Sequence, residues 1–158
     1  MKQAWFSGNN YISSHKVKGH VNSKVSKNGW PTSFPEQDST WFDAAGGLHT
    51  EAVDFSAFLI GLMKGKDISK SLLNEMFKQQ VALDKKLPHY LMNGDTGWGL
   101  GIAIRPVSFG TIYEHGGNNV DFQSGFKINR DNQNGYVFFT NCVHGVAFKN
   151  KIAELLIN

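Results

Sequence analysis

The chain has 158 residues, 41% hydrophobic and 18% charged, which is enough for one domain with a hydrophobic core and too apolar for a disordered segment. The net charge of +3 comes from scattered lysines, and the densest group (Lys16, Lys18, Lys24 and Lys27) lies in a polar stretch, so we expect a solvated loop and no nucleic-acid partner. The single cysteine, Cys142, excludes an internal disulfide and a zinc site of several thiolates.

No hydrophobic run is long enough to cross a membrane, and the N-terminal residues do not have the hydrophobic segment of a signal peptide. Residues 1–43 are rich in Gly, Pro, Asn and Ser, and their hydrophobic residues are too sparse for a long periodic element. Such a long irregular stretch is unusual in a complete domain. We expect residues 1–43 to be the remnant of a helical region, and residues 44–158 to form the structured part.

Two helices are predicted next. Thr50 is a suitable N-cap for the first, and Gly65 ends it. Its hydrophobic stripe has helical spacing and consists of Phe55, Phe58, Leu59, Leu62 and Met63. The second helix is predicted to begin near Ser69 or Ser71 and to bury Leu72, Leu73, Met76 and Phe77. Residues 85–96 contain Pro88 and Asn93-Gly94 and are predicted to be a loop.

The remaining residues are predicted to be rich in strands. Residues 98–104 alternate large residues with Gly99, Gly101 and Ala103, which predicts one strand with a bare face. Residues 111–114 predict a short strand, and residues 120–128 a strand with one polar side. After a turn at 131–135, the continuous hydrophobic run at 136–140 predicts a central strand. A helix from about Gly145, with Phe148, Ile152, Leu155 and Leu156 on its hydrophobic side, completes an α+β fold with an antiparallel sheet.

Three segments in order resemble the β-lactamase-like serine hydrolases, a family of class C β-lactamases, D-alanyl-D-alanine carboxypeptidases and related esterases. Residues 45–58 are similar to the family's glycine-glycine-leucine segment, which opens a helix. Residues 97–101, Gly-Trp-Gly-Leu-Gly, are similar to a strand that follows the family's helical insertion. Residues 113–119 are similar to its His-x-Gly strand, and residues 138–141 to the strand that ends in Thr-Asn. Each segment alone is weak, and their shared order and spacing carry the resemblance.

The resemblance implies a role for His115, Gly116, Gly117 and Asn118. In this family the corresponding strand lines one wall of the active-site cleft, and the N–H after its second glycine is one of two donors for the oxyanion. That donor would be Asn118 here, and the two glycines would leave the strand edge open to substrate. His115 would replace the usual lysine and bind a substrate carboxylate. The alternative is that His115 is a half-buried strand histidine without a role in function.

The family's nucleophile cannot be identified in this sequence. The family uses Ser-x-x-Lys at the start of a helix, which places the lysine beside the serine as its base. Ser13 with Lys16 and Ser124 with Lys127 match the string at the frequency chance gives. We expect Ser124 to lie on a strand and Ser13 to lie outside any helix, so neither fits. Residues 7–9, Ser-Gly-Asn, match the second motif formally but in unsuitable surroundings.

The sequence therefore predicts the C-terminal part of a β-lactamase-like serine hydrolase, inactive by itself, whose ligands would be a D-Ala-D-Ala peptide, a β-lactam or an ester. A non-catalytic peptide-binding module that keeps the cleft wall is the alternative, and an intact small hydrolase using Ser13 is a third. We expect no cofactor and no metal, because the six histidines show no pair at metal-ligand spacing. We also expect a homo-oligomer or a missing N-terminal partner fragment. Parent proteins are often periplasmic or secreted, but this sequence does not indicate a compartment.

Overall fold

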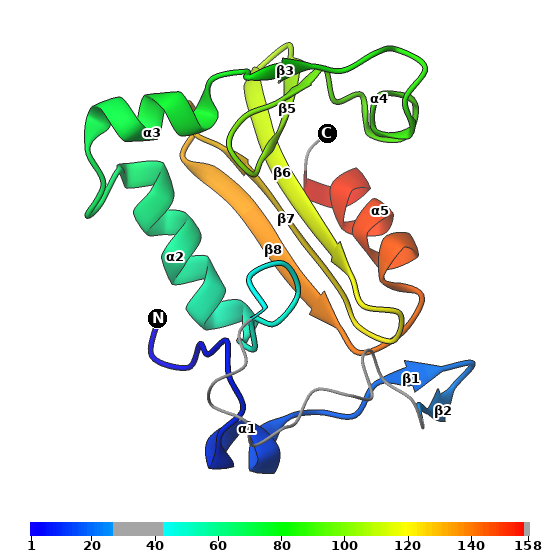
Figure 1. Ribbon diagram of the computed structural model, residues 1–158. Helices are drawn as coiled ribbons and strands as arrows, with labels where there is room; N and C mark the ends of the chain where they lie inside the picture. Colours follow the sequence, from blue (N-terminus) through cyan, green and yellow to red (C-terminus); the bar gives the residue numbers. More distant parts are fainter. Residues whose placement is uncertain (27–42, 157–158) are drawn as a thin grey trace. The chain divides into compact units, whose positions relative to one another are not determined.

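The computed structural model describes residues 1–26 and 43–156, which contain five helices and eight strands (Figure 1). The described residues divide into two compact units. The first unit holds described residues of Met1–Phe55, Gly116–Gly125 and Phe138–Asn158, and the second holds Ser56–His115 and Phe126–Val137. The mixture of helices with antiparallel strands confirms the predicted α+β class.

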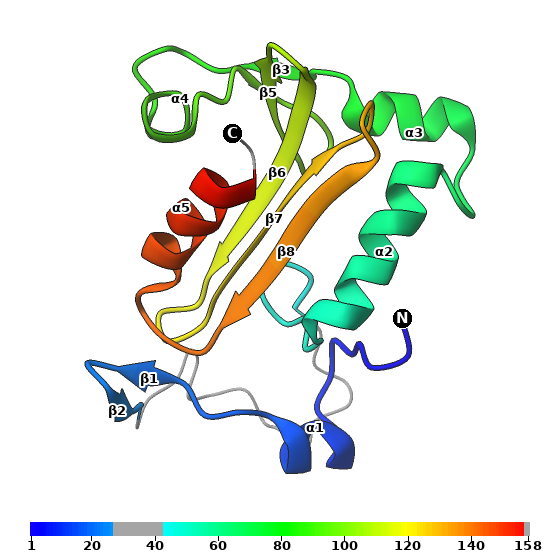
Figure 2. The ribbon, with the colours of Figure 1, turned by 180° about the vertical axis from the view of Figure 1, so that it is seen from behind.

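The main sheet has six strands in the order β3-β4-β5-β6-β7-β8, so consecutive strands are neighbours. The three longest, β6, β7 and β8, lie side by side in Figure 2. The strands are β3 (Val81–Ala82), β4 (Gly97–Trp98), β5 (Ala103–Val107), β6 (Gly110–Asn118), β7 (Gln123–Asn129) and β8 (Asn134–Thr140). Strand β8 lies at one end of the sheet among the described residues, so the prediction of a central strand at 136–140 is wrong.

The hydrophobic run of β8 makes aromatic contacts on both faces, although Phe139 stays 40% exposed, and a central position is not needed to explain it. Phe138 and Phe139 are consecutive, so their side chains point to opposite faces of the strand. Phe138 packs edge-on against Phe148 of α5 (Gly145–Leu156) at 5.9 Å between ring centroids, and Phe139 packs edge-on against Phe55 of α2 (Ala52–Lys64) at 5.8 Å. Helix α5 begins where predicted, but Phe148, Leu155 and Leu156 of its predicted hydrophobic side are 50% to 74% exposed.

The two predicted helices are present, with one difference in capping. Helix α3 (Lys70–Phe77) is capped by Ser69, whose hydroxyl accepts the N–H of Leu72 at 3.1 Å, as predicted. Helix α2 ends at Lys64, before Gly65 with φ of +66°. Thr50, however, does not cap α2, because the helix begins at Ala52 and the Thr50 hydroxyl is buried without a hydrogen-bond partner among the described residues. Leu59 and Leu62 of α2 are buried, but Leu72 of α3 is 53% exposed rather than buried.

The predicted strand at 98–104 is instead a hairpin formed by β4 and β5. Gly97 pairs with Ile104 and Trp98 with Ala103, and the N–H of Gly99 donates to the Ile102 carbonyl at 2.8 Å. Gly101 has φ of +75°, which residues other than glycine rarely adopt. The glycines therefore turn the chain and do not form one bare face. Gly99 does allow a close approach, because a Cβ there would overlap the carbonyl of Met76.

Two further predictions are corrected. The loop predicted at 85–96 contains α4 (Pro88–Asn93), which has proline at its start and ends at Gly94 with φ of +78°. Proline and glycine therefore mark the two ends of a short helix. The predicted polar side of residues 120–128 is not solvated, because Asp121, Gln123 and Lys127 are each at most 7% exposed. Strand β7 also begins at Gln123 and not at residue 120 as predicted.

The described part of the N-terminal segment contains short elements. These are α1 (Asn10–His15), β1 (His20–Val21) and β2 (Lys24–Val25), and β1 and β2 pair with each other. Within the first unit, Trp5 and His49 exchange backbone hydrogen bonds of 3.0 and 2.8 Å. The domain boundary near residue 43 stays a prediction, and residues 27–42 lie outside the described residues.

Candidate functional site

The C-terminal end of β6 extends beyond its partner on one side. The pairing of β5 with β6 runs from Val107 opposite Gly110 to Ala103 opposite Glu114. Strand β6 continues for four more residues, His115, Gly116, Gly117 and Asn118, which are all exposed. No described strand pairs with these four residues on the β5 side. The predicted site residues therefore form an open strand edge.

The backbone pattern shows which amides face this open edge. In an antiparallel pair, alternate residues direct their N–H and C=O groups to one neighbouring strand. On the other side of β6, Asn119 exchanges hydrogen bonds with Phe122 at the turn into β7, at 2.8 and 3.4 Å. Residues 115, 117 and 119 therefore face β7, while Gly116 and Asn118 face the open edge. The turn between β5 and β6 gives the same assignment. It has two residues, so Val107 and Gly110 form a hydrogen-bonded pair, and Pro106, which has no N–H, then occupies a position that makes no hydrogen bond to β6.

An open edge of this kind can pair with an extended peptide or place an N–H near a developing oxyanion. The two glycines keep side chains away from it. A Cβ on Gly117 would lie 2.7 Å from the hydroxyl oxygen of Ser124 on β7, so the site is too crowded there for alanine unless Ser124 moves. A Cβ on Gly116 would lie 3.6 Å from the Ser124 carbonyl oxygen, which is an ordinary contact.

His115 is placed by Trp98, at the end of β4. The two rings meet edge to face, with centroids 5.7 Å apart. His89 of α4 meets Trp98 in the same way at 5.3 Å. Both imidazoles thus contact one indole, and His115 stays exposed. The half-buried histidine that the sequence left open as an alternative is not observed.

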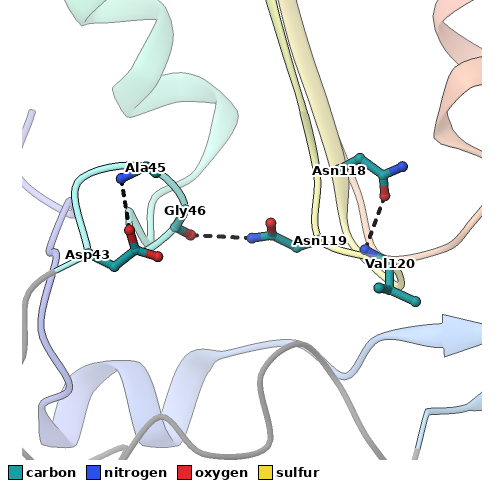
Figure 3. Close-up of a pocket in the computed structure, with 6 residues that line it drawn as sticks. All are labelled: Asp43, Ala45, Gly46, Asn118, Asn119 and Val120. Carbon is teal, nitrogen blue, oxygen red and sulfur yellow. Dashed lines mark hydrogen bonds between the residues drawn. The ribbon is translucent and has the colours of Figure 1, made fainter.

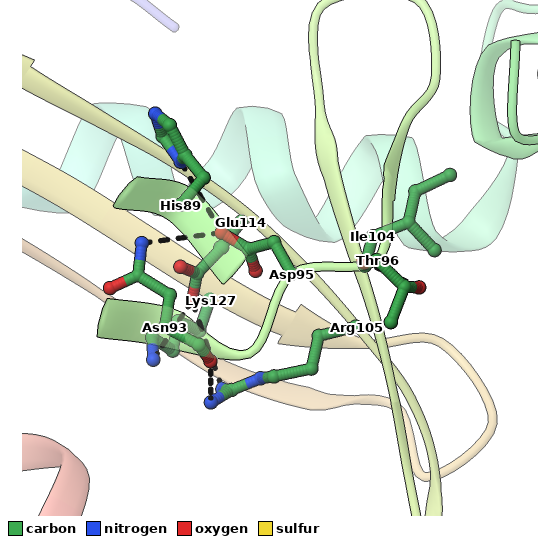
Figure 4. Close-up of polar contacts among 8 residues, drawn as sticks. All are labelled: His89, Asn93, Asp95, Thr96, Ile104, Arg105, Glu114 and Lys127. Atoms are coloured by element: carbon green, nitrogen blue, oxygen red, sulfur yellow. Dashed lines mark hydrogen bonds and ion pairs between the residues drawn. The ribbon is translucent and has the colours of Figure 1, made fainter. Parts of the chain in front are cut away.

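Glu114 precedes His115 on β6 and points into the interior of the second unit. Its carboxylate lies 2.8 Å from the ammonium group of Lys127 on β7 and 3.8 Å from the guanidinium group of Arg105 on β5 (Figure 4). Glu114 and Lys127 are 6% and 7% exposed. Charged side chains so deeply buried need partners, and here they neutralise one another. The network fixes the part of β6 that leads into the site.

Asp95 joins this network from the loop after α4. It is fully buried, and its Oδ2 lies 3.2 Å from Asn93 Nδ2 and 3.4 Å from His89 Nδ1 (Figure 4). Burial raises the pKa of Asp95 above its ordinary value, and the negative charge of Glu114 raises it further. Burial likewise raises the pKa of Tyr136 to about 12, with Glu114 contributing. Arg105 donates to the Asn93 carbonyl at 2.8 Å, which ties α4 to β5.

A pocket of about 360 Å³ adjoins the other end of the site, within the first unit (Figure 3). Two loops form it, residues 43–46 and the turn after β6, and Asn119 joins them by donating to the Gly46 carbonyl at 3.3 Å. Asn118 accepts the N–H of Val120 at 3.0 Å through its side chain. The lining residues are Asp43, Ala45, Gly46, Asn118, Asn119 and Val120.

The two serine candidates lie on different elements. Ser124 lies on β7, as predicted, and i and i+3 on a strand point to opposite faces. Ser13 lies on α1, so the expectation that it is outside any helix is wrong; the apolar residues around it were too few to show helical periodicity. Its hydroxyl donates to the Asn9 carbonyl at 3.1 Å, and Lys16 is the residue after the helix.

Among the described residues, no group of three His, Cys, Asp or Glu side chains could hold a metal ion. No helix of residues 1–26 and 43–156 is long and apolar enough to cross a membrane.

The sequence did not indicate Trp98, Asp95 or Asp43 as parts of a site. The sequence predicts one long strand at 98–104, in which Trp98 would not turn back toward His115. Asp43 and Asn118 are 75 positions apart, and no local pattern relates them. Alternation suggested that Lys127 faces solvent. In the sequence, the buried ion pair is indicated only by Glu114, which precedes His115, and by Lys127 on the next predicted strand.

No protein-family model matches the sequence, and no curated protein matches it. The octameric penicillin-binding protein homologue from Pyrococcus abyssi matches in structure with a TM-score of 0.66 and 17% sequence identity, over 96% of this chain and 34% of that one. D-amino acid amidase from Ochrobactrum anthropi SV3, in complex with D-phenylalanine, matches with a TM-score of 0.62 and 18% identity, over 89% of this chain and 43% of that one. The chain thus has the β-lactamase/transpeptidase-like fold that the resemblance implied, and it spans less than half the length of either protein.

Proposed function

We propose that this chain provides the substrate-binding strand of a β-lactamase-like serine acyl-transfer site. The observation that carries the proposal is the open edge of β6, where the main chain of Gly116 and Asn118 faces outward without a pairing strand. A substrate would lie along this edge as an added strand, and the N–H of Asn118 would donate to the oxyanion. The shared fold supports this reading, since both matched proteins are of that fold class.

His115 would bind the substrate's carboxylate or carbonyl at the start of this edge. Its exposed ring is held at one side by Trp98, so its free nitrogen atoms can reach a ligand along the strand. When protonated, the imidazole would add a positive charge that a neutral residue cannot supply. The ligand classes that fit are a β-lactam, a D-Ala-D-Ala peptide and an ester.

We infer further that the chain alone does not turn over substrate. Lys127 points to the opposite face of β7 from Ser124, and the Ser13 hydroxyl donates to the Asn9 carbonyl while Lys16 follows the end of its helix. The test is incubation of the purified chain with a chromogenic β-lactam, a p-nitrophenyl ester and a fluorescent penicillin, with a complete class C β-lactamase as positive control. We expect no turnover beyond that of the Ser13→Ala and Ser124→Ala variants. A stoichiometric acyl adduct on any serine would contradict the inference, and Ser13 is the first residue to check by mass spectrometry.

The same edge also suits a non-catalytic peptide-binding module, since backbone pairing needs no nucleophile. The two functions differ in what the ligand must contain. A cleft wall for acyl transfer should prefer a D-configured acyl compound with a carboxylate, whereas a strand-binding module should take an extended L-peptide equally well. Titration with the D- and L-forms of one dipeptide separates them.

We also propose that the chain self-associates. Strand β8 ends the sheet among the described residues, and Phe148, Leu155 and Leu156 of α5 are at least half exposed. An open strand edge and exposed hydrophobic residues both favour association. The homologue from Pyrococcus abyssi is described as octameric. Light scattering at micromolar concentration should show a dimer or larger species, and a monodisperse monomer would contradict the proposal.

A further inference from the structure

Helix α4 directs polar residues toward the interior of the second unit and apolar residues toward solvent. His89 and Asn93 are one helical turn apart, and both contact the buried carboxylate of Asp95, at 3.4 and 3.2 Å (Figure 4). Leu91 and Met92, on the other side of the helix, are 69% and 75% exposed. A surface helix ordinarily has the reverse arrangement, with its apolar stripe against the core.

The exposed apolar side chains lie together at helical spacing. Leu87, the N-cap residue, lies four positions before Leu91, and Pro88 lies four positions before Met92. Leu87 is 44% exposed, and Pro88 is exposed as well. We call the side of the helix formed by Leu87, Pro88, Leu91 and Met92 the α4 surface.

Contacts at the ends of α4 hold this surface in place. Pro88 begins the helix, and Gly94, with φ of +78°, ends it by donating its N–H to the Tyr90 carbonyl at 2.9 Å. Arg105 of β5 donates to the Asn93 carbonyl at 2.8 Å. The α4 surface therefore has a fixed orientation within the second unit.

Two lysines precede the α4 surface. Lys85 and Lys86 are both exposed, and neither forms an ion pair with another described residue. Asp84 is the acidic residue beside them, and its carboxylate accepts the backbone N–H of Lys86 at 2.8 Å. The two lysines outnumber this one aspartate, so residues 84–94 carry a net charge of +1 with His89 neutral.

Aliphatic side chains beside lysines have the chemistry that an anionic lipid surface binds. Such a surface takes apolar side chains into the boundary between headgroups and acyl chains, and it attracts nearby lysines. We propose that the α4 surface binds this protein peripherally to membranes that contain anionic lipids. A stable protein–protein interface buries roughly 800 Å² on each partner, which a six-residue helix does not provide by itself. This binding does not depend on the function proposed for the edge of β6.

The test is flotation of the purified full chain with two kinds of vesicle, phosphatidylcholine alone and phosphatidylcholine mixed with phosphatidylglycerol. We expect the chain to float with the mixed vesicles and to bind the neutral vesicles about tenfold more weakly, because the attraction of the lysines is lost. Binding to the mixed vesicles should fall as salt is added, since salt screens exposed charges.

Two double variants locate the contact. Leu91→Ser with Met92→Ser removes apolar area and should weaken binding to the mixed vesicles about tenfold or more. Both side chains are exposed, so this variant should keep the fold, which circular dichroism checks. Lys85→Gln with Lys86→Gln should weaken binding to the mixed vesicles about tenfold and leave binding to neutral vesicles unchanged.

The first unit supplies a matched control for each double variant. Val17→Ser with Val25→Ser replaces two apolar residues that are 60% and 50% exposed and lie next to lysines. Lys16→Gln with Lys18→Gln removes two exposed lysines and changes the net charge by the same amount as the α4 lysine variant. Each control should bind the mixed vesicles nearly as well as the wild type.

Three results would overturn the proposal. The first is a wild-type chain that does not float with the mixed vesicles, and if Leu91→Ser with Met92→Ser then dissociates an oligomer, a second copy of the chain covers the α4 surface. The second is binding that the α4 lysine variant weakens and the Leu91→Ser with Met92→Ser variant does not, which is adsorption by charge alone. The third is binding that the control variants weaken as much as the α4 variants do.

Discussion

The carboxylate of Glu114 lies 2.8 Å from the ammonium group of Lys127, and both side chains are almost completely buried where β6 leads into its exposed end. Glu114 and His115 are consecutive on a strand, so they point to opposite faces. The network beneath the strand fixes its position, while the residue that follows is presented to solvent. Buried charge thus holds the part of β6 up to His115, within the second unit, without being part of the exposed edge.

Replacement of Lys127 should destabilise the protein strongly. Lys127→Met keeps most of the volume but leaves Glu114 with Arg105, 3.8 Å away, as its one cationic partner in the described part of the chain, so we expect a loss of about 3 kcal/mol in the free energy of unfolding. Lys151→Met is the matched control, because its 2.7 Å pair with Glu154 is exposed and should contribute less than about 1 kcal/mol. Urea unfolding followed by circular dichroism measures both. Equal losses in the two variants would contradict the role of burial.

Asp95 should make stability depend on acid pH with an unusual sign. Its pKa is raised above 3.8 in the folded state, mainly by burial and then by Glu114, so the folded protein holds that proton more tightly than the unfolded chain. The stability that this gives is present at low pH and is lost as pH rises from 3.8 through the folded pKa. Relative to Asp95→Asn, the wild type should therefore lose stability over this range and then level off. If the wild type instead gains stability as the pH rises, the hydrogen bond from His89 and the charge of Arg105 stabilise the carboxylate more than burial and Glu114 destabilise it.

Trp98 should report the rings of His115 and His89. The His115 ring meets the indole edge to face at 5.7 Å between centroids, and the His89 ring does so at 5.3 Å. We expect the fluorescence assigned to Trp98, by difference from Trp98→Phe, to change in His115→Gln and in His89→Gln, because each variant removes one ring from the surroundings of the indole. A Trp98 spectrum unchanged in both variants would contradict the ring arrangement.

The spacing of β6 and β7 at the site can be tested with Gly117. Gly117→Ala places a methyl group 2.7 Å from the Ser124 hydroxyl oxygen, so we expect a loss of about 1–3 kcal/mol in the free energy of unfolding from overpacking and a perturbed site. The double variant Gly117→Ala with Ser124→Ala should recover much of that loss, because the overlapping atom is gone. Gly116→Ala serves as the control, since its methyl group would make an ordinary contact at 3.6 Å. Independent, additive effects of the two substitutions would exclude contact between them.

Local signals in the sequence predicted the elements that depend on local interactions. Ser69 caps α3 as expected from its side chain, and Gly65 ends α2 with a positive φ angle. The fold class followed from periodicity together with the resemblance, whereas the strand predicted at 111–114 is longer in the structure and runs from Gly110 to Asn118. These features depend on residues that are close in the sequence.

The errors arise where distant contacts decide the structure. Glycines at 97, 99 and 101 have the spacing of a strand face, yet Gly101 turns the chain, and only the pairing of β4 with β5 distinguishes the two. Lys127 alternates like a solvent-facing residue but is buried, because Glu114 on the neighbouring strand compensates its charge. The pocket joins loops that are 73 residues apart, and no periodic pattern relates Gly46 to Asn119.

The central claim is that the open edge of β6 is a binding strand, and one titration tests it most directly. A D-alanyl-D-alanine peptide is added to the ¹⁵N-labelled chain while backbone amide shifts are followed. The edge geometry predicts that the largest shifts fall on Gly116, Gly117 and Asn118, and that Gly116→Ala, which retains the fold, weakens them. Shifts centred instead on the lysine-containing stretch from Lys16 to Lys24 would contradict the claim and indicate an electrostatic binding module.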